Sequence, residues 1–204
     1  MIGYSEDYFN WQKQLGFLGG KYDTIKYLKY IKENDKILDF GCGGGFILKE
    51  LNHRDAFGLE PNPTAMADAL SKGLTIVSSL EQLQKDSFDV IFSNHVFEHL
   101  ECPIEIAREL KKYLKIGGLL LVTVPNECSV KYTPNNIDQH LYTWSEINLG
   151  NMLYKSGYEV LEVKTIRFRW TPLFTCVHHF FGFNIFKLFC YFNSYLHRDR
   201  KEVM

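Results

Sequence analysis

The sequence predicts an α/β fold built on a doubly wound, mostly parallel sheet with helices on both faces. From Lys36 to Val163, short apolar runs alternate with segments of helical periodicity, which is the pattern of parallel strands joined by helical crossovers. A glycine-rich loop at residues 41–45 follows the first of these runs. Ligands of such sheets bind at the carboxyl ends of the strands, so the residues after each run are the candidates for chemistry.

The predicted strands and helices follow one another in order along the chain. Six apolar runs are the expected strands: 37–40, 56–60, 75–77, 88–93, 119–124 and 160–169. Between them, 46–51 and 103–114 have helical patterns, and Asn62-Pro63 is a typical N-cap and first helical residue. Two possible capping boxes, Ser79 with Gln82 and Thr143 with Glu146, open a short helix and a longer one that stops near Gly157.

Composition narrows the class of protein. A chain of 204 residues with 46% apolar residues can form one domain with a full core. The net charge of −1 disfavours a broadly basic nucleic-acid binder, and the five cysteines form no C-x-x-C pair. The N-terminus lacks a basic region followed by an apolar run. We therefore expect a cytoplasmic protein without a nucleic-acid partner, disulfide framework or cysteine zinc site.

The glycine loop and the acidic residue after the second strand indicate a nucleoside-containing cofactor. Glycines let the backbone turn sharply and let a ligand approach the main chain, and the Glu60 carboxylate can accept both hydroxyls of a ribose. A dinucleotide fingerprint is not met, because Phe46 stands where its third glycine belongs. Asp39 would repel a pyrophosphate but suits an ammonium group. These features favour S-adenosyl-L-methionine, which has no phosphate; a dehydrogenase and a loop that only shapes the chain are the alternatives.

Four segments, 37–45, 58–60, 88–100 and 114–122, resemble in order the motifs of class I (Rossmann-like) S-adenosylmethionine-dependent methyltransferases. The resemblance covers about residues 20–165 and is closest to the small-molecule methyltransferases of quinone, natural-product and cell-surface polysaccharide pathways. It implies S-adenosylmethionine as cofactor, S-adenosyl-L-homocysteine as product, and a final antiparallel strand. The cofactor-binding residues that it implies are Asp39, Gly41, Cys42, Gly43, Glu60, Pro61, Ser79, Leu80 and Asn94.

In this resemblance, Gly41 and Gly43 line the methionine part, Glu60 holds the ribose, and Ser79 and Leu80 lie beside the adenine. Many relatives carry an aspartate at that last turn to bind the adenine amino group. This chain has Ser78-Ser79 there, so backbone groups or the Ser79 side chain would have to replace it.

A cluster of histidines follows the fourth predicted strand. Residues 95–99 match the H-x-x-E-H motif of some zinc peptidases, but His95 comes directly after a strand, which disfavours that function. Some methyltransferases that act on catechol-type or ribose hydroxyls carry E-x-x-E-H here, with a later His, and hold a divalent metal. His95 in place of the first glutamate disfavours magnesium, and we expect Glu98 and His99 to support the loop without a metal ion. His95 and His140 are the candidate catalytic bases; a structural role is the alternative for each.

The acceptor is expected to be a small molecule or a sugar-containing precursor, and the histidines favour O-methylation. An RNA ribose methyltransferase with a His/Glu metal site is one alternative, against which the near-zero net charge argues. A non-catalytic module that binds S-adenosylmethionine is the other.

The two ends of the chain lie outside the predicted strands and helices of the sheet. We assign residues 1–165 to the cofactor-binding domain, with 1–20 as a cap or a packed helix and 135–144 as a substrate-side loop. Residues 166–204 form an aromatic-rich helical extension of the same domain, with no convincing strand after residue 169.

The tail segment 173–196 is long enough to span a bilayer but is interrupted by polar residues, so a spanning helix is not expected. Its apolar stripe at helical spacing is most typical of core or homodimer contacts. A hydrophobic acceptor pocket and a peripheral membrane contact are the alternatives. The stripe consists of Phe181, Ile185, Leu188, Phe189, Phe192 and Leu196.

Overall fold

The computed structural model describes residues 6–127, 139–166, 174–196 and 201–204. The chain divides into two compact units. Residues 1–96 and 105–122 belong to the first unit, and residues 97–104 and 123–204 belong to the second. The predicted boundary between the cofactor-binding domain (1–165) and its C-terminal extension (166–204) stays a prediction.

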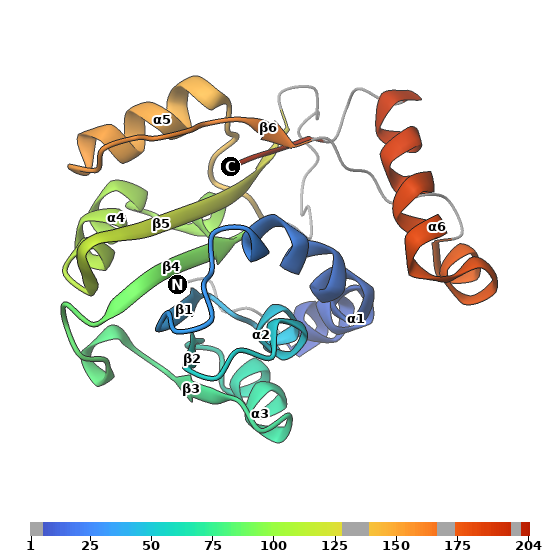
Figure 1. Ribbon diagram of the computed structural model, residues 1–204, viewed down its shortest axis with the longest axis horizontal. Helices are drawn as coiled ribbons and strands as arrows, with labels where there is room; N and C mark the ends of the chain where they lie inside the picture. Colours follow the sequence, from blue (N-terminus) through green and yellow to red (C-terminus); the bar gives the residue numbers. More distant parts are fainter. Residues whose placement is uncertain (1–5, 128–138, 167–173, 197–200) are drawn as a thin grey trace. The chain divides into compact units, whose positions relative to one another are not determined.

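The strands form a seven-stranded sheet in the order β3-β2-β1-β4-β5-β7-β6 (Figure 1). The β1–β2, β1–β4 and β2–β3 pairs are parallel, whereas β7 pairs antiparallel with both β5 and β6. The predicted doubly wound, mostly parallel α/β sheet is therefore confirmed. The strands are β1 (Ile37–Phe40), β2 (Ala56–Leu59), β3 (Thr75–Val77), β4 (Phe88–Asn94), β5 (Leu114–Asn126), β6 (Thr165–Ile166) and β7 (Lys201–Val203).

Strand β1 lies at the centre of the first unit, because both of its edges are paired and all four of its residues are buried. A strand buried on both faces requires a continuous apolar run, and Asp39 is the one charged residue in it. Asp39 is in register with Gly58 of β2 and with Phe92 of β4. This register places the Asp39 carboxyl near the carboxyl end of the most buried strand.

The helices begin where the sequence offers capping groups. The Asn62 side chain accepts hydrogen bonds from the Thr64 and Ala65 amides at 2.9 and 3.1 Å, and the capping box at Ser79 and Gln82 is present, so both predictions are confirmed. The α-helices are α1 (Glu6–Leu28), α2 (Phe46–Leu51), α3 (Pro63–Ser71), α4 (Pro103–Lys111), α5 (Glu146–Lys155) and α6 (Phe174–Leu196). Two short 3₁₀ helices cover Leu80–Gln82 and Phe97–His99.

The predicted capping box of Thr143 and Glu146 is wrong. Ser145 is the N-cap of α5, and its amide donates to the Asn148 side chain at 2.6 Å. Glu146 instead accepts hydrogen bonds from the Thr165 amide at 2.6 Å and the Thr165 hydroxyl at 2.7 Å. The glutamate therefore ties α5 to β6 rather than capping its own helix.

The final antiparallel strand that the resemblance implies, which no pattern after residue 169 indicated, is present as β7. Val203 is buried between Val124 of β5 and Thr165 of β6. Beside it, Lys164 and Met204 exchange two backbone hydrogen bonds of 2.8 and 3.0 Å. Backbone pairing on both edges stabilises so short a strand although its sequence is mostly charged. The sixth strand is shorter than predicted in its described part, and 167–169 lie outside the described residues.

Candidate active site

Glu60 is fixed at the point where β1 and β2 end. Its Oε2 accepts a hydrogen bond from the Gly43 amide and its Oε1 accepts one from the Asn62 amide, both at 2.8 Å. An ionised carboxylate has about four acceptor sites, so each oxygen can accept a further hydrogen bond. The structure therefore holds a buried, oriented carboxylate that suits a pair of hydroxyl groups.

The glycine loop leaves space for a ligand above its backbone. Gly41 has a φ of +80°, and a Cβ there would lie 2.4 Å from Val96, so no larger residue fits. Gly43 has a φ of +52°, and a Cβ there would meet nothing within 4 Å. Gly41 is thus required for packing, whereas Gly43 faces open space beside Glu60. Cys42 is buried, and its Sγ occupies the place that a Cβ on Gly58 would take.

Two buried carboxyl groups lie close to this loop. Burial raises the pKa of Asp39 well above its usual value, and the nearby Glu60 and Asp23 raise it further. Burial also raises the pKa of Glu60, although the amide hydrogen bonds from Asn62 and Gly43 oppose the change. A cation placed here would favour the charged forms of both groups. This electrostatic setting fits a ligand that has an ammonium or sulfonium group and no phosphate.

Binding of S-adenosylhomocysteine, whose amino group is cationic, is expected to weaken as the pH is lowered. The raised pKa values mean that Asp39 and Glu60 become protonated at a higher pH than ordinary carboxyls, which titrate near pH ~4. Protonation removes the charge that attracts the ammonium, so ligand affinity should rise with pH through this window and binding should release protons. The same shifts make folding of the ligand-free protein less favourable as pH rises through the window, because charging these groups costs more in the folded state.

Calorimetry across pH, in two buffers of different ionisation enthalpy, measures both the affinity and the number of protons released. An affinity that does not change with pH, with no proton release, would contradict this electrostatic description of the site.

Asn94 is bound by one face of α1. Its Oδ1 accepts hydrogen bonds from the Tyr27 hydroxyl at 2.9 Å and from Lys26 Nζ at 3.3 Å, and its Nδ2 donates to Asp23 at 3.3 Å. Lys26 is buried and pairs with Asp23 at 2.8 Å. Sequence reasoning missed these three residues. Their i, i+3, i+4 spacing could have shown that they share a helix face, but not that Asn94 would meet them. The cofactor role of Asn94 stays a prediction.

The other predicted cofactor residues lie after β2 and β3. Pro61 directly follows Glu60, and Ser79 and Leu80 follow the end of β3. The Ser78 and Ser79 amides donate to the Gln82 side chain at 2.8 and 3.3 Å. The capping box therefore already uses the Ser79 amide, and the adenine role of this turn stays a prediction.

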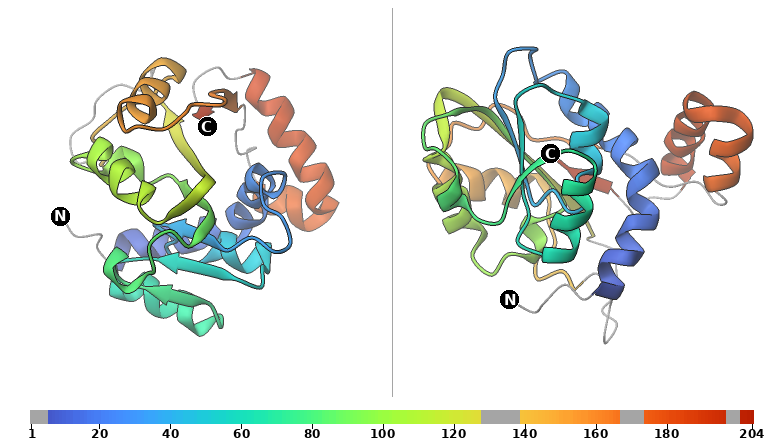
Figure 2. Two further views of the ribbon diagram at one scale, coloured as in Figure 1. Left: turned by 60° about the vertical axis from the view of Figure 1, so that its left-hand side comes forward. Right: turned by 90° about the horizontal axis from the view of Figure 1, so that it is seen from below.

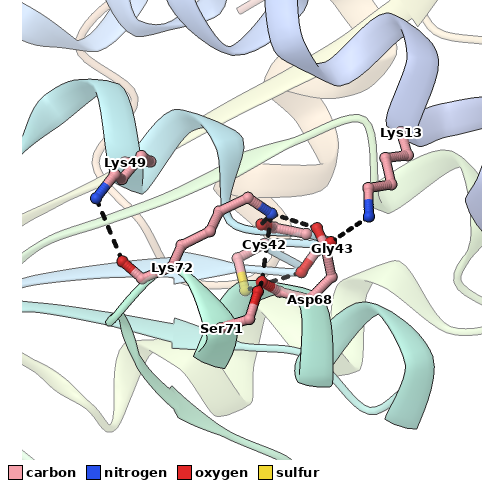
Figure 3. A network of polar contacts seen from close by, with 8 residues as sticks. Lys13, Cys42, Gly43, Lys49, Asp68, Ser71 and Lys72 are labelled. Atoms are coloured by element: carbon pink, nitrogen blue, oxygen red, sulfur yellow. Dashed lines mark hydrogen bonds and ion pairs between the residues drawn. The ribbon is translucent and has the colours of Figure 1, made fainter.

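A network of ionic contacts supports the glycine loop from outside (Figure 3). Lys72 Nζ donates to the Gly44 carbonyl at 2.7 Å and pairs with Asp68, which also pairs with Lys13 of α1 at 2.5 Å. The network therefore links the loop to both α1 and α3. Sequence reasoning missed it, because only the Asp68–Lys72 pair is local, with i, i+4 spacing, whereas the contacts to Lys13 and Gly44 join residues distant in the sequence.

The two histidines predicted as catalytic bases, His95 and His140, belong to different units. His95 directly follows β4 in the first unit and has a φ of +56°. In the second unit, His140 Nδ1 lies 2.6 Å from Glu127 Oε2, and His140 Nε2 lies 3.9 Å from Oε1 of the fully buried Glu98. The His99 and His140 rings meet edge to face, with centroids 4.8 Å apart.

Glu127 is the functional candidate that sequence reasoning missed in this cluster. It follows the carboxyl end of β5, as Glu60 follows that of β2, so the same positional signal could have found it. A carboxylate that accepts from Nδ1–H fixes the tautomer in which neutral imidazole presents Nε2 as a proton acceptor. The Glu127–His140 pair is thus arranged as an oriented general base. Of the predicted substrate-side loop, residues 135–138 lie outside the described residues.

The same cluster has the donor atoms of a possible cation site. Glu98, His99 and His140 offer ligand atoms that lie within 4.8 Å of one another. Mixed nitrogen and oxygen donors suit zinc-like ions better than magnesium. The expectation that no metal is needed stays a prediction, which chelation tests below.

The fold, together with the Glu60 carboxylate held beside the glycine loop, defines an α/β protein of the Rossmann-like methyltransferase class. In the solved structures, a possible histamine N-methyltransferase from Thermotoga maritima superposes with a TM-score of 0.65 over 80% of this chain and 84% of that one, at 19% identity. A likeness at that identity shows the fold alone.

Sequence comparison identifies the family. A model described as "Methyltransferase domain" matches residues 17–163, and the chain belongs to this family. Ubiquinone biosynthesis O-methyltransferase of Nitrosococcus oceani is 31% identical over 122 residues, which are 52% of each protein. The tRNA U34 carboxymethyltransferase of Hydrogenovibrio crunogenus is 33% identical over 163 residues, covering 68% of this chain and 49% of that protein. The chain spans about half the length of these curated relatives.

Proposed function

We propose that this protein transfers a methyl group from S-adenosylmethionine to an oxygen of a small molecule or sugar-containing precursor and releases S-adenosylhomocysteine. The observation that carries the proposal is the Glu60 carboxylate, held by the Gly43 and Asn62 amides beside the buried Asp39. This arrangement offers acceptors for ribose hydroxyls and negative charge for an ammonium, in a loop that does not match a pyrophosphate fingerprint.

In this proposal, one group of residues binds the cofactor and another transfers the proton. When bound, S-adenosylmethionine supplies a methyl group attached to a sulfonium. The leaving group is a neutral thioether, so its departure needs no general acid. Glu60, Gly43 and Asp39 hold and orient it, which is the main contribution a protein makes to such a displacement. A hydroxyl acceptor must lose its proton as the new C–O bond forms. His140, oriented by Glu127, takes that proton on Nε2; His95 is the other candidate.

The acceptor class is supported by the chain's charge and by the range of its relatives. Residues 1–163 contain sixteen Lys and Arg against twenty-two Asp and Glu, a balance that disfavours a phosphate backbone as partner. The relatives are named for reactions on a quinone precursor and on tRNA, so RNA remains the alternative acceptor. Oxygen is favoured because a general base is most useful to a hydroxyl group.

The proposal is tested by incubating the protein with S-adenosylmethionine and panels of phenols, quinols, sugar nucleotides and RNA. Mass spectrometry should detect a product one CH₂ unit heavier than its acceptor, with S-adenosylhomocysteine formed in equal amount. Binding of S-adenosylmethionine without acceptor-dependent S-adenosylhomocysteine would instead support the non-catalytic binding module. A methylated RNA alone would support the RNA alternative.

Removing metal ions is expected to leave methyl transfer unchanged, because the Glu127–His140 pair supplies a base without a metal ion. The measurement compares initial rates before and after treatment with a strong chelator that is then dialysed away. Loss of activity that one added divalent ion restores would contradict the prediction and assign Glu98, His99 and His140 to a metal site.

A further inference from the structure

The described part of α6 exposes many large apolar side chains. Seven of its large apolar side chains are between 42% and 75% exposed, and we call this set the α6 face. Its members are Phe180, Phe181, Ile185, Leu188, Phe189, Tyr191 and Phe192. Two others, Phe186 and Cys190, lie one helical turn apart and are buried. The interpretation of the stripe as core is therefore wrong for its described members.

The shape of α6 does not suit a membrane span. Gly182, with φ 75° and ψ 174°, interrupts the helix and separates two helical segments, and Figure 2 shows the bend. The exposed Asn184 and Lys187 lie within the second segment. Among the described residues, no helix is long and apolar enough to cross a membrane. A bent helix with apolar residues over much of its surface is suited to lie along an interface instead.

Charge identifies the kind of interface. Residues 164–204 contain seven Lys and Arg and two Asp and Glu, which gives a net charge of +5, whereas residues 1–163 have a net charge of −6. Most of these cations lie directly before and after α6 in the sequence. Cations beside an amphipathic segment are attracted to the negative surface of a leaflet that contains anionic lipids. A second copy of the chain would present the same positive segment to this one, so charge disfavours self-association through the α6 face.

We propose that α6 is an interfacial anchor, which lays the α6 face on the headgroup boundary of a bilayer containing anionic lipids. The aromatic and aliphatic side chains enter the boundary, and the cations that flank α6 in the sequence hold the helix at the surface. The proposal concerns binding alone, so it stands or fails independently of the methyl-transfer reaction.

Co-sedimentation of the full chain with vesicles tests the proposal. Vesicles of phosphatidylcholine with phosphatidylglycerol should carry the protein into the pellet, and raising the salt concentration should weaken the binding because salt screens surface charge. Vesicles of phosphatidylcholine alone should bind at least about fivefold more weakly.

Two variants separate the apolar and the ionic contributions to vesicle binding. Replacing Phe181, Phe189 and Phe192 together by serine should abolish pelleting, and the exposed Lys187→Glu should weaken it at least about fivefold. Ile116→Ser is the matched control, because Ile116 is fully exposed but lies outside α6. Circular dichroism checks that each variant is folded, and Lys187→Glu keeps the test valid if the triple variant does not fold.

Three results would overturn the proposal. The first is absence of wild-type protein from pellets with anionic vesicles. The second is pelleting that the folded variants do not change. The third is a stable dimer in analytical ultracentrifugation that the triple serine variant dissociates while no vesicle binding occurs, which would assign the α6 face to a second copy of the chain.

Discussion

Replacing Glu60 with alanine is expected to weaken binding of S-adenosylmethionine by at least about tenfold. Hydrogen bonds to a charged group contribute about 1.5–3 kcal/mol each, and ~1.4 kcal/mol corresponds to a factor of ten in affinity. The substitution also removes the acceptor that fixes the Gly43 and Asn62 amides, so the glycine loop should lose part of its preorganisation. Isothermal titration calorimetry measures the change directly.

Two further variants make the Glu60 experiment specific. Glu60→Gln keeps the size of the side chain but removes its charge, and should lie between wild type and alanine. Glu33→Ala removes an exposed glutamate and should bind as wild type does. An unchanged affinity in the folded Glu60→Ala protein would remove the ribose role of this residue.

Replacing His140 with glutamine is expected to lower kcat by about 10²–10⁴-fold while leaving S-adenosylmethionine affinity unchanged, because a positioned general base contributes a factor of this size. Glu127→Gln should lower kcat less and should change its pH dependence, because it disturbs the hydrogen bond of 2.6 Å that orients the imidazole. Steady-state rates across pH, with a hydroxyl acceptor found in the screen, provide the measurement.

His53 provides the matched control, since it is a partly exposed histidine of the first unit and its replacement by glutamine should leave kcat unchanged. If His140→Gln retains full activity and His95→Gln does not, the base is His95. If both variants keep the wild-type rate and pH profile, general-base catalysis by either histidine is excluded.

The parts of the fold that were predicted correctly are those set by local sequence. The run at 37–40, the Asn62-Pro63 cap and the box at Ser79 and Gln82 each carry their signal within a few residues. The same local reasoning failed for β7, where pairing with β5 and β6 determines the structure of Lys201–Val203. It failed again at Glu146, because its partner Thr165 lies in another element.

The candidate site shows the same division. Glu60 could be found because it directly follows β2, and Gly43 because it lies in the glycine-rich loop after β1. The Lys13–Asp68 contact could not, because it joins α1 to α3 and no local pattern reveals that these helices meet. The α6 stripe was recognised by its periodicity, but periodicity cannot tell a buried apolar face from an exposed one. That distinction needed the exposure of Phe181 and its neighbours.

The central claim is that a phosphate-free nucleoside with a cationic amino group binds between Asp39 and Glu60. A crystal structure of the protein with S-adenosylhomocysteine tests it most directly. We predict density for the ligand with its ribose hydroxyls on the Glu60 carboxylate and its amino-acid end over Gly41 and Gly43. A site that stays empty at saturating ligand, or that instead takes up a dinucleotide through its pyrophosphate, would contradict the claim.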